Sequence, residues 1–410
     1  MVIGIICEYN PPHRGHAYQL SVLRARYPDS TIVCVMSGSF TQRGTPACAG
    51  KYARARAALA LGADAVLELP FPYSCAPAEL FARGGVGILA ALGADTLCFG
   101  TEGDVCDALC STAERLDGGT FAAAMTEAME NPANRGTGYS VMRERVYASL
   151  YGDAQAALLR TPNNTLGVEY LRAIRYYGAD MTPITVPRTG DAHDAPAADT
   201  ELPAQSRIVS ASAVRALLGA GRFADAAALL PEVTAEMLHT EAAAGHLCTD
   251  PDSIPGPLLL HTFRTQPAEQ LAQYAGLGGG LSQRLCAASF RAHTVREWYA
   301  LAATKKYTNA AIRRAALAGM FGITEEEQRN PPSYTVLLAA NRRASAFLRR
   351  ASKENRLPVI SRPAAYLQMP ETIRRAFERG LAADAVYGML LPSPVSHAEL
   401  LAAVPYTAQS

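Results

Sequence analysis

Short runs of apolar residues alternate with longer amphipathic stretches along the first half of the chain. Five runs are continuous and apolar enough to be buried strands: Val2–Cys7, Thr31–Met36, Ala65–Leu69, Thr96–Phe99 and Ile184–Val186. The stretches between them have helical patterns: Gly15–Arg26, Lys51–Leu61, Ala78–Leu92 and Asn164–Tyr177. Strands that are apolar along their whole length and alternate with helices predict an α/β fold, with a parallel sheet covered on both faces.

The rest of the chain divides into helical segments and one polar loop. Residues 101–160 have helical patterns without clear strands, so we expect a helical insertion there. Residues 189–206 are polar and rich in Ala, Asp and Pro, which indicates a loop, and the pattern after Ser210 is overwhelmingly helical. We therefore predict an α/β domain over residues 1–220 and a mostly α-helical domain over residues 221–410.

The sequence favours a cytoplasmic location, and the positions of its cysteines argue against metal sites and disulfides. No run approaches the roughly 18 apolar residues of a membrane span. The N-terminus MVIGIICEYN lacks a basic n-region and has the pattern of a buried strand, so we expect a cytoplasmic protein without a membrane partner. The nine cysteines are scattered, mostly in apolar runs, and none forms a C-x-x-C pair. We expect them to be small buried residues rather than metal ligands or disulfides.

Charge is distributed unevenly along a chain whose formal net charge is +1. Residues 305–379 contain 15 lysines and arginines against 6 aspartates and glutamates, a surplus of +9 that leaves −8 for the remainder. A local surplus of this size favours an anionic partner for that segment. A set of solvated helix faces would have the same composition, and both interpretations stay open at this point.

Two histidines follow the first predicted strand, in the stretch NPPHRGH. Ligands of open parallel sheets bind beyond the carboxyl ends of the strands. Gly15 opens the next helix there, and a helix N-terminus favours anions. His13 and His16 can then donate hydrogen bonds to an α-phosphate on which negative charge builds. The alternative is two histidines that only cap a turn. The chain has no G-x-x-x-x-G-K-[ST] string, so a triphosphate would not be held by a P-loop.

A second phosphate signal lies much later in the chain, in SASAVRALL. Ser210 or Ser212 can cap a helix there and leave N–H groups facing an anion, and Arg215 lies one turn further in. An H-x-G-H motif followed by such a late helix start is the pattern of the nucleotidyltransferase superfamily. Its members attack the α-phosphate of a nucleoside triphosphate and release pyrophosphate.

Longer blocks resemble one family of that superfamily, the tRNA(Met) cytidine acetate ligases. The blocks are GIICEYNPPHRGHAYQL, VMSGSFTQRGTPA, LGADAVLELPFPYSCAPAELFA, CFGTE, TPNNTLGVEYLRAI and KKYTNAAIRRAA, and the similarity runs from Met1 to about residue 350. The resemblance implies a Rossmann-like nucleotidyltransferase domain followed by a helical tRNA-binding domain. It also implies an enzyme that makes acetyl-adenylate from acetate and ATP, then acetylates N4 of the wobble cytidine of elongator tRNA(Met) to give N4-acetylcytidine.

The resemblance further implies which residues bind ATP. The family's nucleotide loop matches Cys7, Glu8, Tyr9, Asn10, Pro11, Pro12, His13, Arg14, Gly15, His16, Ala17, Tyr18, Gln19 and Leu20, and its other ATP-binding positions match Gly100, Asn163, Arg188, Thr189 and Ser212. We expect His13, His16 and Arg215 to be catalytic. Asn163 could otherwise be only an N-cap, and Arg188 a surface residue. The chain departs from the family at Pro187, where a lysine is expected, and in a longer loop over residues 191–206.

Other polar residues near the predicted crevice have roles that the residues alone leave open. Arg43 is expected to orient acetate or pyrophosphate, although SGSFTQRG could also be a simple turn. We expect Mg²⁺ with ATP, with Glu68, Glu79 and Glu102 as candidate ligands, and no paired-carboxylate spacing selects one of them. Acetate is already an anion that can attack a positioned α-phosphate, so neither a nucleophilic residue nor acetyl-CoA is expected.

The basic segment suits the transfer of acetate to tRNA. The residues expected to contact tRNA phosphates are Lys305, Lys306, Arg313, Arg314, Arg342, Arg343, Arg349 and Arg350. Tyr307 and Tyr334 are candidates for base stacking. Two other functions stay open, a small-molecule nucleotidyltransferase of the same superfamily and a non-catalytic tRNA-binding relative. The sequence does not select an oligomeric state.

Overall fold

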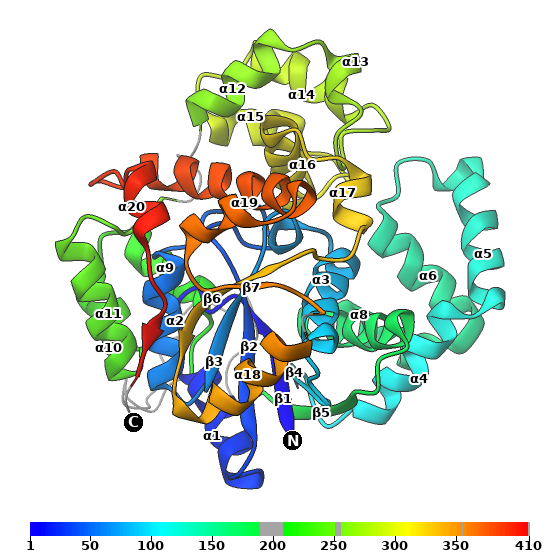
Figure 1. Cartoon of the computed structure of the whole chain (residues 1–410). Coiled ribbons are helices and arrows are strands. Elements are labelled where there is room, and N and C mark those ends of the chain that lie inside the picture. Colours follow the sequence, from blue (N-terminus) through cyan, green and yellow to red (C-terminus); the bar gives the residue numbers. More distant parts are fainter. Residues whose placement is uncertain (189–207, 251–255, 355, 409–410) are drawn as a thin grey trace.

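The computed structural model describes residues 1–188, 208–250, 256–354 and 356–408 (Figure 1). These residues contain a sheet of eight strands in the order β5-β4-β1-β2-β3-β6-β7, with β8 paired to β6. The first five strands pair in parallel and are β1 (Val2–Cys7), β2 (Thr31–Ser37), β3 (Ala65–Leu69), β4 (Thr96–Thr101) and β5 (Thr182–Pro187). Each contains a strand expected from the apolar pattern, so the α/β fold is confirmed.

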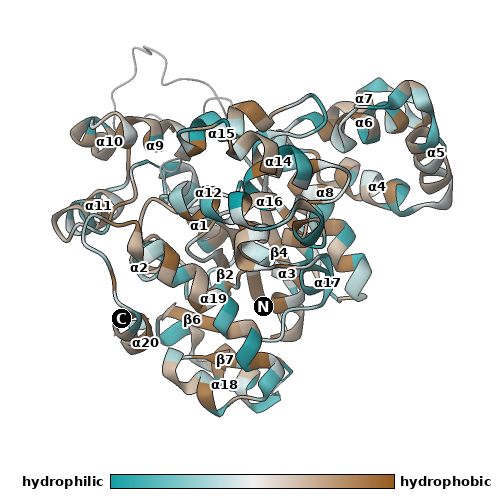
Figure 2. Cartoon of the chain, turned by 90° about the horizontal axis from the view of Figure 1, so that it is seen from above, coloured by the Kyte–Doolittle hydropathy of each residue, from teal (hydrophilic) through white to brown (hydrophobic). Residues whose placement is uncertain are grey.

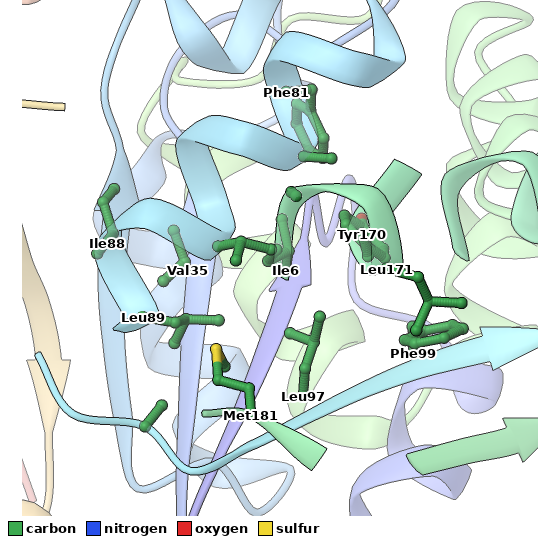
Figure 3. Close-up of a cluster of buried hydrophobic side chains, with 14 of the residues drawn as sticks. Ile6, Val35, Phe81, Ile88, Leu89, Leu97, Phe99, Tyr170, Leu171 and Met181 are labelled. Atoms are coloured by element: carbon green, nitrogen blue, oxygen red, sulfur yellow. The ribbon is translucent and has the colours of Figure 1, made fainter. Parts of the chain in front are cut away.

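Helices cover both faces of this sheet because its strands are apolar on both sides. Val33 and Val35 face one core, which is completed by α3 (Ala78–Ala91) and α8 (Pro162–Tyr177) (Figure 3). Ile32, Cys34 and Met36 alternate with them and face a second core against α1 (Arg14–Arg26) and α2 (Lys51–Ala60).

The repeated tetrapeptide LGAD aligns neighbouring strands. Gly62 and Gly93 end their helices with φ of 119° and 78°, a conformation that glycine adopts without strain. The aspartates two residues later each accept a hydrogen bond from the first residues of the adjacent strand, Asp64 from Ile32 N at 2.8 Å and Asp95 from Val2 N at 3.0 Å. Both LGAD segments therefore place an aspartate that holds the start of the following strand beside the start of its neighbour.

The strand order creates a crevice at the centre of the sheet. The chain runs from β1 to β2 and β3 on one side, then returns to β4 and β5 on the other side of β1. The loops that leave β1 and β4 diverge at this point, which is where open α/β sheets bind ligands. Between β4 and α8 the chain forms the helices α4 (Cys106–Asp117), α5 (Gly119–Glu130), α6 (Tyr139–Tyr151) and α7 (Asp153–Ala156).

The second half of the chain is largely helical. Its helices are α9 (Ala211–Gly219), α10 (Phe223–Ala228), α11 (Glu232–Ala243), α12 (Gly256–Thr265), α13 (Ala268–Leu271), α14 (Leu281–Ser289), α15 (Val295–Ala302), α16 (Asn309–Phe321), α17 (Glu325–Arg329), α18 (Ser345–Glu354), α19 (Glu371–Met389) and α20 (His397–Ala402). Seen from above, α12–α16 lie between the α4–α7 insertion on one side and α9–α11 on the other (Figure 2).

This second half also adds three strands that the sequence analysis did not predict. They are β6 (Thr335–Ala340), β7 (Val359–Ile360) and β8 (Tyr406–Thr407), and β6 pairs antiparallel with β3. Tyr334, just before β6, is 4% exposed and packs against Phe377, so its proposed role in stacking RNA bases is wrong. The division of the chain into two domains at residue 220 stays a prediction.

The structure also bears on what composition led us to expect of the cysteines and of membrane-spanning helices. All nine cysteines are free, and five of them are buried. None of the described helices is long and apolar enough to cross a membrane.

A buried cluster of charges joins helix α19 to strand β3 and helix α2. Lys51 Nζ lies 2.7 Å from Glu68 Oε2 and 2.6 Å from Asp384 Oδ2, and Ser39 Oγ donates to Asp384 Oδ1 at 2.6 Å. Burial alone would lower the pKa of Lys51, but the carboxylates of Asp384 and Glu68 raise it above its usual value. Lys51 therefore stays charged, and it neutralises two largely buried carboxylates.

We expect Lys51→Met to lower the free energy of unfolding by about 3–5 kcal/mol, because it leaves two buried carboxylates without a counter-charge. The measurement is chemical denaturation followed by circular dichroism. Lys353→Met removes an exposed lysine from α18 and is the control, with an expected change within about 0.5 kcal/mol. Equal effects of the two substitutions would contradict this account of the cluster.

Candidate active site

A cavity of about 440 Å³ opens at the carboxyl ends of β1, β4 and β5. It has the size of a small-molecule site. The predicted site residues that line it are Cys7, Glu8, Tyr9, Asn10, His13, Gly15, His16, Tyr18, Gln19, Arg43, Gly100, Asn163, Arg188, Ser212 and Arg215. Sequence positions more than two hundred residues apart therefore meet in one cavity.

Several members of the predicted nucleotide loop do not line the cavity. Leu20 is fully buried in the core beneath α1, because residues on that face of the helix must cover the sheet. Arg14 Nη2 donates to the carbonyls of Ala228 and Leu230, each at 3.0 Å. Pro11, Pro12 and Ala17 also lie outside the lining, and Thr189 lies outside the described residues.

The two histidines form a stacked pair at the start of α1. His13 is the N-cap residue, and its Nδ1 accepts a hydrogen bond from Gly15 N at 3.0 Å. His16 Nδ1 accepts a hydrogen bond from His13 N at 3.1 Å, and the ring centroids lie 3.6 Å apart. Since both Nδ1 atoms accept, each neutral ring carries its proton on Nε2. Capping and ligand binding are thus compatible, because capping uses only the Nδ1 edge of each ring.

The surroundings of the pair favour the neutral form. Burial, followed by the neighbouring His13 ring and the Arg188 guanidinium, lowers the pKa of His16 well below its usual value. At neutral pH His16 is therefore an uncharged donor, and positive charge in the cavity comes from arginines. Arg43, Arg160, Arg188 and Arg215 all line it, so the cavity suits a substrate with several negative charges.

The late helix start reaches the histidine loop as predicted. Ser210 caps α9 by accepting a hydrogen bond from Ala213 N at 3.2 Å, so it is Ser210 rather than Ser212 that caps the helix. Ser212 lines the cavity instead. Arg215 Nη1 donates to the carbonyl of Asn10 at 2.6 Å, which fixes its guanidinium beside the loop that carries His13.

Asn163 is held by a carboxylate at the edge of the cavity. Its Nδ2 donates to Glu102 Oε1, and Glu102 Oε2 accepts from Asn164 N at 3.1 Å. Asn164 Oδ1 in turn accepts from Glu102 N at 2.9 Å. Glu102 thus joins the end of β4 to the start of α8 and orients Asn163.

The other two candidate metal ligands have their own cationic partners. Glu68 pairs with Lys51, and Glu79 pairs with Arg83 at 2.7 Å. Among the residues that the structure describes, no group of three or more His, Cys, Asp and Glu side chains could hold a metal ion.

A buried arginine that the sequence analysis did not single out holds the loops of the site together. Arg54 is fully buried and donates to the carbonyls of Glu8, Ser37, Gly38 and Ala49.

The lining of the cavity also includes residues that were not predicted individually. They are Thr41, Gln42, Thr45, Arg160, Thr161, Thr165 and Tyr170. The available signal was the position of all of them except Arg160 in the blocks VMSGSFTQRGTPA and TPNNTLGVEYLRAI.

The exposed basic residues expected to bind tRNA form two groups, one at each end of the sheet's strands. Lys305 and Lys306 are exposed near α16, above the carboxyl ends of the strands (Figure 1). The second group is exposed around α18 at the amino ends, and it comprises Arg342, Arg343, Arg349 and Arg350. Arg343 donates to Pro28 O and Arg350 to Gly93 O, in the loops that enter β2 and β4.

The two arginines on α16 make contacts inside the protein. Arg314 Nη1 donates to Gln42 O at 3.0 Å, and the Arg313 guanidinium lies 5.5 Å from the ring of Tyr299. These contacts join the helix to the loop after β2 and to α15. Tyr307 is half-buried beside them, and its hydroxyl donates to Gly279 O at 2.8 Å.

The sequence of this chain matches a known family over nearly its whole length. The sequence model of the HIGH Nucleotidyl Transferase family matches residues 1–400. The chain belongs to this family. Two relatives are the tRNA(Met) cytidine acetate ligases of Syntrophotalea carbinolica and Acetivibrio thermocellus. The first is 36% identical and covers 95% of this chain and 94% of its own length; the second is 30% identical and covers 96% of each.

Solved structures of the family agree with this assignment. Crystal structures of Thermotoga maritima TmcAL, one bound with alpha-thio ATP and one apo, match with TM-scores of 0.87 and 0.89. Each is 27% identical and covers 100% of both chains. The resemblance inferred from the sequence blocks is therefore confirmed, as is the Rossmann-like nucleotidyltransferase architecture.

We expect His16 to be neutral at pH 7 with its proton on Nε2, and to titrate well below pH 6.5 because burial disfavours the imidazolium. The measurement is ¹⁵N NMR of the imidazole nitrogens across a pH series. His16→Gln removes the signal and so assigns it. An Nδ1–H tautomer, or titration at the usual histidine value, would refute the arrangement described for the pair.

Proposed function

We propose that this protein is an ATP-dependent acetate ligase that forms acetyl-adenylate and acetylates N4 of the wobble cytidine of elongator tRNA(Met). The observation that carries the proposal is the stacked pair of His13 and His16, which line one cavity together with four arginines. Membership of the family, and relatives named tRNA(Met) cytidine acetate ligase, support this activity over others of the superfamily.

The first half-reaction needs positioning and charge stabilisation more than a protein nucleophile. The two Nε2–H groups and the guanidiniums of Arg188 and Arg215 bind the triphosphate, and acetate attacks the α-phosphate as pyrophosphate leaves. Neutral histidines donate hydrogen bonds without competing for protons, while the arginines offset the added charge on phosphorus. Arg43, from the loop after β2, is placed to orient acetate or pyrophosphate.

Mg²⁺ accompanies the triphosphate in this proposal. Mg²⁺ keeps several waters and binds largely through substrate phosphates, so it does not require a protein cage. The donors of the cavity fit such a bound ATP complex, because only one carboxylate is among its described lining residues. ATP activates free acetate directly, and acetyl-CoA has no part in the reaction.

We expect wild-type protein to catalyse acetate-dependent ATP–pyrophosphate exchange and to transfer labelled acetate to tRNA(Met). His13→Ala and His16→Ala should each lower exchange by about 10²–10³-fold, because each removes one donor to the developing charge. Binding of tRNA, measured by filter retention, should change little in either variant.

The same assay separates the alternative functions. Transfer of AMP to a small metabolite without tRNA would identify a nucleotidyltransferase of another substrate class. Binding of tRNA by the wild type without exchange or acetylation would identify a non-catalytic relative. Either outcome would overturn the proposed function.

We propose that the exposed lysines near α16 contact the anticodon arm, because they lie on the same side of the sheet as the cavity. The Lys305→Glu/Lys306→Glu double variant should weaken tRNA binding and lower the slope of log K against log[salt] by about 1 to 2. Acetate-dependent exchange should be retained, since neither lysine lines the cavity.

The Arg349→Glu/Arg350→Glu variant makes the same charge change on α18, at the opposite end of the sheet. It tests whether the second basic group also binds tRNA. An equal loss of binding would extend the contact surface to α18. A loss in this variant alone would contradict the placement of the anticodon arm near α16.

A further inference from the structure

One carboxylate stands among the cationic and neutral side chains of the cavity. Of the described residues that line it, Glu8 is the only acidic one, and its side chain is half-buried. The phosphates of ATP and the carboxylate of acetate both repel Glu8, so its side chain must accept a hydrogen bond, a proton or a cation instead. Its presence therefore points to a step in which a proton or a cation must be received.

Glu8 follows the same strand as His13 and His16, but it lies away from three other residues expected to hold the nucleotide. Gly100 lies in β4, Arg188 follows β5 and Asn163 starts α8, so they occupy the β4–β5 side of β1. Glu8 follows β1, and its Oε1 accepts a hydrogen bond from Gln42 N at 2.8 Å, in the loop after β2. The carboxylate is thus held toward the β2 side of the cavity, away from Gly100, Asn163 and Arg188.

The backbone of Gln42, which holds Glu8, also contacts the helix that follows the exposed lysines. Gln42 N donates to Glu8, and Gln42 O accepts from Arg314 Nη1 of α16 at 3.0 Å. The two backbones are in close contact, since a Cβ on Gly44 would lie 2.7 Å from Arg314 N. A tRNA that lies against this end of α16 approaches the cavity from the side of Glu8.

Resting on the proposed function, we infer that Glu8 is the general base of the acetyl transfer. The N4 amine of cytidine attacks the carbonyl carbon of acetyl-adenylate and forms the C–N bond. One N4 proton passes to Glu8 Oε2, and the C–O bond to AMP breaks as the electron pair leaves with the phosphate oxygen. Glu8 later releases the proton to water.

The chemistry of the acceptor explains why this step needs a base. The lone pair of the N4 amine is delocalised into the cytosine ring, so the amine becomes strongly acidic only as the new bond forms. A carboxylate within reach of that proton is worth about 10²–10⁴-fold in rate. Among the described residues Oε1 of Glu8 is occupied by Gln42 N, which orients the group and leaves Oε2 for the amine.

The decisive variant is Glu8→Gln, whose amide oxygen can still accept from Gln42 N but whose side chain cannot take up a proton. Because Glu8 lines the cavity within the predicted nucleotide loop, we expect acetate-dependent ATP–pyrophosphate exchange and acetohydroxamate formation with added hydroxylamine to fall far less than acetyl transfer does, and tRNA binding to change little. Single-turnover acetyl transfer to tRNA(Met) should fall about 10²–10⁴-fold. Glu8→Asp, which retains a carboxylate on a shorter side chain, should recover part of the transfer rate.

Glu79→Gln is the matched control, since it removes a carboxylate paired with Arg83 outside the cavity and should not affect transfer. A parallel loss of exchange and transfer in Glu8→Gln would assign Glu8 to binding of ATP or its cation and overturn the inference. Unchanged transfer would also overturn it. Failure of wild-type protein to form acetyl-adenylate would instead reject the proposed function on which the inference rests.

Discussion

The site depends on a single buried arginine. Arg54 brings a full positive charge into the protein and surrounds it with backbone carbonyls rather than a carboxylate. Those carbonyls belong to the ends of β1 and β2 and to the segment before α2, so one side chain holds the loops with Glu8, Gln42 and the two histidines together. Burial lowers the pKa of Arg54, yet a guanidinium stays charged in proteins. Because each of these carbonyls must point at the guanidinium to stabilise its charge, the backbone of the loops that carry them is held in one orientation.

With its loops fixed in this way, the cavity assigns hydrogen-bond donation and positive charge to different side chains. The histidines are capped into place and uncharged, and the arginines supply the attraction for an anionic substrate. Because the donors are fixed before substrate binds, little reorganisation is needed when charge builds on phosphorus. Glu8 is held against the loop after β2, so one cavity contains both donors for an anion and a single carboxylate.

The sequence was most informative where a local pattern had only one good structural solution. Continuous apolar runs predicted β1–β5, and H-x-G-H with the SASAVR helix start predicted two walls of the cavity. It was less informative where the same pattern suits two structures. The run TVLLAA of β6 is short and lies among helices, so periodicity could not separate strand from buried helix. Leu20 was included in the nucleotide loop because a contiguous block cannot show which face of α1 covers the sheet. Nor could the sequence show that the basic residues lie at two opposite ends of the sheet.

The antiparallel strand β6 has a consequence for the order in which the molecule is made. Thr335 Oγ1 bonds to Glu68 O across 267 positions of the chain. At about 5–20 residues per second, a ribosome needs roughly 13 to 53 s to make that stretch. During this time β3 is an uncovered sheet edge, and such edges pair readily with other chains. Completion of the sheet is thus a late event of synthesis, and the nascent chain is most exposed to aggregation before β6 emerges.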